Sequence, residues 1–532
     1  MTSQGKCGAE ALLATEMRAR KAEAANNDTS RPYIFSSAEV LHALDNNESG
    51  DASLLKKAMR GLFCFDIRRK LFYRFEDGYW KKDLEEEYLE RARGILQAAY
   101  LQEEKRQSVL AFKDNSPEEE SSPELALKAK AARDRAKSLL MALKQRRSQA
   151  NTLRRLRNIM VLAATGINGL NVPGTNWNAD PWLLQAKDRV IDLRSGRDRP
   201  GRPLDYINKV APTPWRGLSA MCPVWEQFIS SVFRDDEKLA LYMQKVLGAA
   251  LLGMPSQQEF YILHGAGRNG KSTLFETVME VLGEELASPI KTSLIMEDRR
   301  FSGSADPELL SLQGKRIVWA CESGNRKKLD TEQVKLFTGG DTLSGRYNYS
   351  NEIITFPPTH TLFLLTNHMP HIQEADTAIW DRLRAIPFNV RFVDNPDPNA
   401  GERQKDPYLK EKLLRESSGI LAWLVLGCLL WQKEGLNPPE VVLDYSNQYR
   451  LDEDCIQNFI QEKCLLGAQY RVQASVLYEA FSSWHKDCFG ETSRIMSQRR
   501  FMADITSKPG ITKEKRHFTY CYGLGLASDG GA

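Results

Sequence analysis

The pattern of apolar and polar positions predicts a strand, a glycine loop and a helix near the middle of the 532-residue chain. Tyr261, Ile262 and Leu263 make a short apolar run that is typical of a buried strand. Further on, apolar residues recur at the spacing of one helical face, at Leu274, Phe275, Val278, Val281 and Leu282. Glycines separate the two patterns, so the backbone is expected to turn tightly between them.

The N-terminal part of the chain shows its own patterns. Aromatic residues alternate with charges around Asp77-Gly78, which predicts a hairpin. Residues 82–111 are expected to be helical, a Pro/Ser/Glu-rich linker is expected near 114–124, and one long helix is expected from about Pro123 to Ala164. The end of that helix carries a run of arginines, which indicates either a solvated helix face or a collar that contacts phosphates: Arg146, Arg147, Arg154, Arg155 and Arg157.

The C-terminal part shows similar signals. Residues 176–214 contain short strand and turn signals, and residues 222–254 are expected to be helical. The apolar run from Ile420 to Trp431 is too short to span a membrane and predicts a buried helix. Near the end, one helical face is expected from Val476, Leu477, Ala480, Phe481 and Trp484, followed by a second helix and a basic hairpin.

Composition narrows the class of protein. Hydrophobic residues make up 42% and charged residues 27% of the chain, which is typical of globular domains. The net charge is only +4, so any surface for nucleic acid is expected to be local. The nine cysteines have no C-x-x-C spacing, which excludes the usual zinc and disulfide signatures and favours a reducing, cytoplasmic location.

The glycine loop matches the phosphate-binding template G-x-x-x-x-G-K-[ST]. Its backbone is expected to cradle the phosphates of ATP, with Lys271 reaching the β- and γ-phosphates and Ser272 binding Mg²⁺. The predicted nucleotide-binding residues are Gly265, Ala266, Gly267, Arg268, Asn269, Gly270, Lys271, Ser272 and Thr273.

Polar residues at the ends of later apolar runs supply the other parts of an ATPase. The stretch 315–322 is apolar from Ile317 onward and ends at Glu322, a carboxylate that suits Mg²⁺ or the attacking water. The stretch from Thr359 to Leu365 leads to Asn367, an amide that suits orientation of that water. Arg382 and Arg384 follow, and either is suited to stabilising transition-state charge across a subunit interface; each arginine alone would more often be a surface ion-pair partner.

Taken together, these blocks resemble the superfamily 3 helicases of the phage/plasmid and poxvirus primase-helicase group. The resemblance covers most of residues 160–526. It implies Lys271, Ser272 and Glu322 as nucleotide and metal residues, Asn367 as the sensor, and Arg382, or second Arg384, as the arginine finger. Relatives often have a second acid just after the glutamate that matches Glu322 (the Walker-B acid), where this chain has Gly324, so metal binding is expected to rest on Glu322 and Ser272 alone.

The resemblance also implies DNA contacts. Lys335 and Gly339-Gly340-Asp341 match a family motif that lies between Glu322 and Asn367 in the chain. In this family that motif leads to a hairpin that lines the pore of the ring, which implies Arg346 and Tyr347, together with Lys335, as DNA-binding residues. A C-terminal winged helix is expected to add Arg499 and Arg500. For a winged helix, binding to another protein is the alternative that the residues leave open.

The expected fold is α/β: an AAA+ P-loop ATPase core with a mainly helical or mixed N-terminal domain and a C-terminal winged helix. The expected divisions are a disordered tail at 1–30, an N-terminal helicase-associated domain at 31–215, a helical collar at 216–254, the ATPase at 255–395, a helical segment at 396–450 and the winged helix at 451–532. The N-terminal 160 residues contain no Asp-x-Asp cluster, so intrinsic priming is not expected.

The expected function is that of an ATP-dependent replicative helicase of a phage, satellite or mobile element. The resemblance implies a homo-hexamer that moves 3′→5′ on single-stranded DNA and unwinds forks, with a primase, initiator or host replication proteins as further partners and no membrane. Three alternatives stay open: an AAA+ NTPase that senses or remodels nucleic-acid complexes without unwinding, a primase-helicase with residual priming, and a small-molecule kinase.

Overall fold

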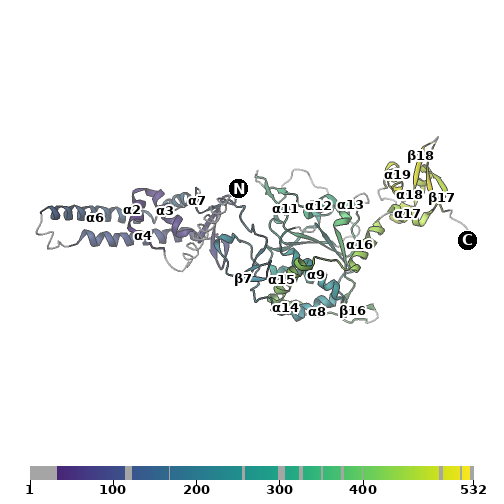
Figure 1. The fold of residues 1–532 in the computed structure, drawn as a ribbon, viewed down its shortest axis with the longest axis horizontal. Coiled ribbons are helices and arrows are strands. Elements are labelled where there is room, and N and C mark those ends of the chain that lie inside the picture. Colours follow the sequence, from purple (N-terminus) through teal and green to yellow (C-terminus); the bar gives the residue numbers. More distant parts are fainter. Residues whose placement is uncertain are drawn as a thin grey trace, which may run out of the picture. The chain divides into compact units, whose positions relative to one another are not determined.

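The computed structural model divides into two compact units (Figure 1). One reaches Ile191 and includes Asp198–Val210; the other comprises Asp192–Arg197 and the chain from Ala211 onward. The residues that the structure describes are 33–113, 123–166, 168–254, 258–297, 306–322, 328–348, 352–372, 377–397, 400–453, 455–489, 495–515 and 518–527. The predicted tail at 1–30 and most of the predicted linker near 114–124 therefore lie outside the described residues.

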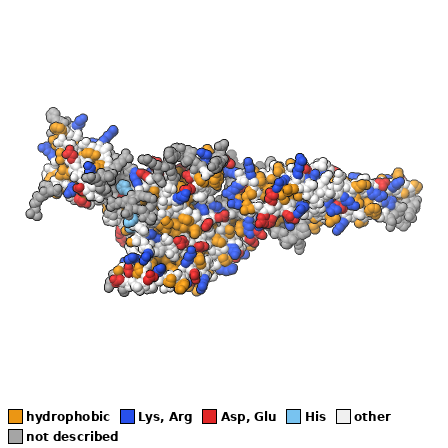
Figure 2. Space-filling model, turned by 180° about the vertical axis from the view of Figure 1, so that it is seen from behind, with side chains coloured by type: hydrophobic (Ala, Val, Ile, Leu, Met, Phe, Trp, Pro, Cys, Tyr) orange, Lys and Arg blue, Asp and Glu red, His pale blue; other side chains and the backbone are white. Residues whose placement is uncertain are grey.

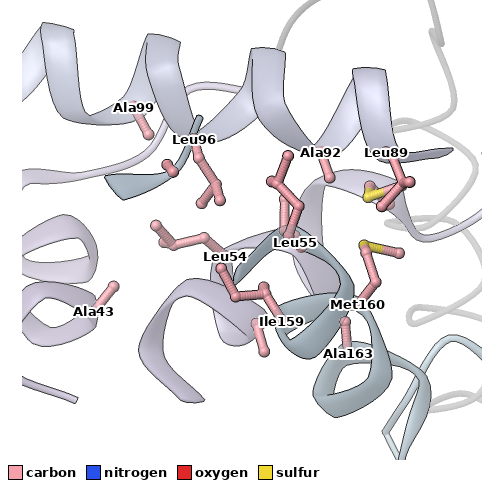
Figure 3. Packing of buried hydrophobic residues seen from close by; sticks show 14 of the residues in the cluster. Ala43, Leu54, Leu55, Leu89, Ala92, Leu96, Ala99, Ile159, Met160 and Ala163 are labelled. Atoms are coloured by element: carbon pink, nitrogen blue, oxygen red, sulfur yellow. The ribbon is translucent and has the colours of Figure 1, made fainter. Parts of the chain in front are cut away.

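The N-terminal unit is built on helices α2 (Ser37–Asp45), α3 (Asn47–Met59), α4 (Glu87–Ala111), α6 (Pro123–Gln149) and α7 (Leu153–Ala164). Its core joins Leu54 and Leu55 of α3 to Leu96 of α4 and Ile159 of α7 (Figure 3). The prediction of one helix from 123 to 164 is wrong. Thr152 has an extended backbone, with φ −83° and ψ 127°, and this break lets α6 pack on α4 while α7 packs on α3.

The arginines in this region mostly hold the unit together. Asp51 is fully buried; it pairs with Arg146 at 3.3 Å and Arg155 at 2.7 Å, and also accepts a bond from Tyr100. Arg147 pairs with the buried Glu104 at 2.6 Å. Arg146, Arg147 and Arg155 therefore form neither a solvated face nor a phosphate-binding collar, because carboxylates of the same unit neutralise them. These carboxylates are far from the arginines in the sequence and approach them only in the folded chain.

Two small sheets complete the N-terminal part. Strands β1 (Phe63–Asp66), β2 (Leu71–Glu76), β3 (Tyr79–Lys82) and β4 (Asn171–Val172) form a sheet of order β3-β2-β1-β4. The predicted hairpin is confirmed: Asp77 and Gly78 both have positive φ, which a two-residue turn between twisted strands requires. Strands β5 (Leu183–Gln185), β6 (Val190–Asp192) and β7 (Arg197–Arg199) follow, and then the 3₁₀ turn η1 (Pro203–Asp205).

The second unit contains a five-stranded parallel sheet of order β14-β8-β13-β10-β9. Its strands are β8 (Phe260–His264), β9 (Ala287–Ile290), β10 (Ile317–Glu322), β13 (Thr361–Thr366) and β14 (Leu383–Pro387). The mixed α/β class with a parallel sheet is therefore confirmed. The helices of this region are α8 (Pro223–Val232), α9 (Glu237–Ala250), α10 (Lys271–Leu282), α11 (Pro307–Ser311), α12 (Thr331–Thr338) and α13 (Thr377–Arg382), with the 3₁₀ turn η2 (Thr292–Leu294).

Smaller elements follow the sheet. The strands β11 (Leu343–Gly345) and β12 (Ile354–Phe356) pair as an antiparallel hairpin, and β15 (Arg391–Val393) pairs with β16 (Glu402–Gln404). Helix α15 (Ser417–Glu434) is largely buried, which confirms the predicted buried helix. Within the described parts of the chain, no single helix is long and apolar enough to cross a membrane; α14 (Leu409–Arg415) and α15 together pass on length and composition, with a 73° bend.

The C-terminal residues have the order α16 (Glu440–Glu453), α17 (Cys455–Lys463), β17 (Cys464–Gln473), α18 (Ala474–Phe489), α19 (Gln498–Ile505), β18 (Thr512–Lys515) and β19 (Thr519–Leu526). The three strands form an antiparallel sheet of order β17-β19-β18 over a core that includes Phe459, Phe481 and Phe501. The predicted helical face is confirmed at Leu477, Phe481 and Trp484, but Val476 is exposed because it lies about 100° around the helix from Leu477.

Candidate nucleotide site

The loop between β8 and α10 has the backbone shape of an anion cradle. Gly267, Arg268 and Gly270 have φ values of +89°, +51° and +87°. Left-handed residues within a short turn point successive backbone N–H groups into a common concavity, which suits phosphate oxygens. Helix α10 begins directly after this loop, so its positive dipole end faces the same place.

Tight packing around the loop explains its first glycine. A Cβ at Gly265 would lie 2.3 Å from the Phe388 carbonyl oxygen and 2.3 Å from Asn269 Nδ2. Asn269 is itself buried and donates to that same carbonyl at 3.2 Å. The loop is therefore tied to the segment after β14, and only glycine fits at position 265.

Lys271 is held at the centre of this arrangement. The residue is buried, and its Nζ donates to the Gly265 carbonyl at 2.7 Å and to Asn367 Oδ1 at 3.4 Å. Burial lowers the pKa of Lys271 to about 8, because removal from water disfavours the charged amine. A phosphate placed here would restore that charge, so the side chain suits an anionic ligand.

Strand register brings the other predicted polar residues to the same edge. In the parallel sheet Glu322 lies beside Thr366, and Thr366 lies beside His264, the residue before the loop. The sheet therefore ends at one edge with Glu322, Asn367 and Gly265 on neighbouring strands. Ser272 is exposed at the start of α10. Nothing is described of the Glu322 side chain, so its contact with a metal stays a prediction.

The two candidate arginines lie at the other end of the sheet. Arg384 is paired with Tyr261, four residues before Gly265, which places it about 13 Å of strand from the loop, and Arg382, which precedes Leu383, lies farther away still. Arg384 pairs with the buried Glu259 at 3.0 Å, and Tyr261 also donates to that carboxylate. Arg382 Nη1 instead donates to neutral acceptors, the Lys335 carbonyl at 2.9 Å and Thr338 Oγ1 at 3.2 Å.

The predicted DNA-binding residues are spread over three elements. Lys335 is half-buried on α12, while Arg346 and Tyr347 follow β11, with Tyr347 exposed. Arg499 is exposed on α19, and the Arg500 side chain lies outside the described residues. On the face seen in Figure 2, Lys and Arg side chains are interspersed with Asp and Glu.

Two further residues join the site that sequence reasoning did not identify. His264 contacts the Asn367 backbone carbonyl through Nε2 at 3.2 Å and the Tyr445 hydroxyl through Nδ1 at 2.6 Å. Burial lowers the pKa of His264, so its ring stays neutral near pH 7. Its place directly before the glycine template was a usable signal, whereas no pattern near Tyr445 marks it.

Comparison with known proteins identifies relatives of the chain. A family model described as "D5 N terminal like" matches residues 52–234. A protein of Acanthamoeba polyphaga mimivirus named "Putative helicase L207/L206" is 30% identical over 325 residues, which cover 58% of this chain and 34% of that protein. An African swine fever virus protein named "Putative primase C962R" is 25% identical over 331 residues, which cover 58% of this chain and 34% of that protein. The chain thus spans about a third of the length of these relatives.

The alignment with a solved structure, the C-terminal region of NrS-1, covers 89% of this chain and 99% of the NrS-1 chain, with 12% sequence identity and a TM-score of 0.42. A score at this level does not establish a shared fold. The matched domain and the viral relatives support a relationship between this chain and the D5-like primase-helicases of superfamily 3.

Proposed function

We propose that the chain is an ATP-dependent DNA helicase that acts in replication. The observation that carries this proposal is the position of Lys271, whose amine lies between the Gly265 carbonyl and Asn367 at the sheet edge where β10 also ends. The names of the viral relatives, helicase and primase, support a role on DNA.

The chain's own residues suggest how hydrolysis would proceed. The left-handed loop backbone and the start of α10 would bind the phosphates, and Lys271 would shift from the Gly265 carbonyl to the γ-phosphate. Asn367 would orient the attacking water, and Ser272 and Glu322 would hold Mg²⁺, which fits a hydroxyl and carboxylate donor set. Mg²⁺ supplies screening of phosphate charge when bound.

The positions of Arg382 and Arg384 suggest a shared site. Both arginines lie at the opposite end of the sheet from the loop of their own subunit. An arginine finger would therefore reach the γ-phosphate from a neighbouring copy in a ring, which the superfamily suggests is a hexamer. Arg382 suits this role better than Arg384, because no carboxylate in the described chain is recorded in an ion pair with Arg382, whereas Glu259 neutralises Arg384.

DNA contacts are proposed from two places. The β11–β12 hairpin with Arg346 and Tyr347 would line the ring and bind one strand by phosphate contact and stacking, with 3′→5′ movement as the family suggests. The order helix, strand, two helices and two strands after α16 supports a winged helix, whose Arg499 would contact duplex DNA. The second candidate is an ATPase that senses nucleic acid without unwinding it.

The test is ATP hydrolysis by the full chain with and without single-stranded DNA, together with strand displacement on a forked duplex. We expect DNA to stimulate hydrolysis and the fork to open, and Lys271→Ala to abolish both activities. Stimulation without displacement would favour the second candidate. If DNA neither stimulates hydrolysis nor is displaced, the helicase proposal fails.

A mixing experiment tests the shared site. Lys271→Ala and Arg382→Ala subunits are each expected to be inactive, yet a mixture should recover some activity, because some interfaces then combine an intact loop with an intact arginine. A mixture that stays inactive while both variants still assemble would refute a site built from two subunits.

A further inference from the structure

Helix α16 contacts three segments around the candidate site through one face. Tyr445, Tyr449 and Glu453 are four residues apart and therefore lie in one row along the helix. Tyr449 donates to the Pro370 carbonyl, and Glu453 accepts from the Ile372 backbone N–H at 3.0 Å. Both contacts hold the segment that follows Asn367 and leads from β13 toward α13.

The same helix also contacts β8 and β14. The Ser446 hydroxyl accepts from the Ala385 N–H at 2.9 Å, next to Arg384. The Tyr445 hydroxyl lies 2.6 Å from His264 Nδ1, at the end of β8. An element outside the sheet thus bonds to the glycine-loop strand, the Asn367 segment and the arginine strand.

The hydrogen bonds of His264 define a single arrangement of its protons. Its Nε2 lies 3.2 Å from the Asn367 carbonyl oxygen, and a carbonyl can only accept, so Nε2 carries the proton. In the neutral ring, Nδ1 is then an acceptor, and the Tyr445 hydroxyl must donate to it. The ring is therefore held between a donor on α16 and an acceptor on the backbone of Asn367.

The amide of Asn367 completes a continuous path, because its Oδ1 accepts from Lys271 Nζ at 3.4 Å. We propose that Tyr445 and His264 are positioning residues, which set the orientation of Asn367 at the nucleotide site. This inference rests on the proposed ATPase function. According to this inference, α16, a helix that comes after the ATPase core in the chain, also influences the rate of hydrolysis.

The experiment compares Tyr445→Phe with the unchanged chain in steady-state ATP hydrolysis. The variant keeps the ring that packs against the core and loses only the hydroxyl. If Asn367 acts on the attacking water, kcat should fall by about tenfold, the effect of one lost hydrogen bond, while KM and the Kd for ATP change less than about twofold. Tyr408→Phe is the matched control, because that exposed side chain lies on the surface.

Two further variants separate positioning from general structure. In an Asn367→Ala background, Tyr445→Phe should have no additional effect on kcat, because the residue through which it acts is gone. His264→Gln places an amide N–H where Nε2 lies, so it should retain more activity than His264→Ala.

The outcomes are distinguishable. An unchanged kcat for Tyr445→Phe, an undiminished effect of that change in the Asn367→Ala background, or equal kcat for the two His264 variants would overturn the inference. A wild-type chain that does not hydrolyse ATP would overturn the proposed function instead.

Discussion

Arg382 and Arg384 are two residues apart, yet the structure predicts that their removal has different consequences. Arg384 forms an ion pair with Glu259, whose side chain is only 8% exposed, and truncation to alanine would leave that carboxylate buried without its cation. Removing one partner of a buried pair costs about 3–5 kcal/mol. Because the Arg384 side chain is 23% exposed, we expect about 3 kcal/mol, near the lower end of that range.

Arg382 bonds to a carbonyl and a hydroxyl, which are neutral and lose less when it is removed. Arg382→Ala should therefore cost only about 1–2 kcal/mol of unfolding free energy. If this guanidinium serves a neighbouring site, however, kcat should fall by roughly 10³-fold, as for other arginine fingers. Urea unfolding of each variant gives the first quantity, and ATP hydrolysis of folded protein gives the second.

The pH dependence provides an additional check. Burial raises the pKa of Glu259, so the folded state binds this proton more tightly than the unfolded state does. Stability therefore falls as pH rises from the ordinary carboxyl pKa through the raised one. Loss of Arg384 raises that pKa further, so Arg384→Ala should be destabilised more at pH 8 than at pH 5.

The double variant Glu259→Gln/Arg384→Ala, which has no buried charge, is the control and should regain stability at pH 8. The reasoning is refuted if Arg384→Ala loses activity without losing stability, or if Arg382→Ala unfolds as readily as Arg384→Ala.

Two other predictions follow from buried charges. The pKa of Lys271 is lowered to about 8, so ATP binding above pH 8 should take up a proton and weaken as pH rises, whereas ATP binding at pH 6.5 should take up no proton at Lys271. Calorimetry of ATP binding in two buffers of different ionisation enthalpy measures the proton uptake. Equal proton uptake above pH 8 and at pH 6.5 would contradict the prediction. Asp51→Asn should lower the unfolding free energy, measured by urea unfolding, by about 3–5 kcal/mol, since Arg146 and Arg155 lose their shared carboxylate. The control Asp77→Asn, at an exposed ion pair with Lys81, should cost under about 1 kcal/mol. Equal losses for the two variants would argue against the buried network.

Local patterns were sufficient wherever neighbouring residues decide the structure. The strand at 260–264, the helix from Lys271 and the turn at Asp77-Gly78 depend on hydrophobic spacing and on glycine, and each is found as predicted. The break at Thr152 was missed because both flanking segments have helical patterns, and only packing against different partner helices separates them.

The candidate site divides in the same way. The chain alone determined the loop Gly265–Thr273 and the polar residues at strand ends, Glu322 and Asn367, since a phosphate cradle needs a fixed local spacing of glycine, lysine and serine. Only the tertiary structure decided that Glu259 neutralises Arg384, that the arginines near 146–155 bind Asp51 and Glu104, and that Tyr445 reaches His264. These contacts join residues far apart in the chain, and which carboxylate or hydroxyl meets which side chain depends on how strands and helices pack, a choice that no local pattern records.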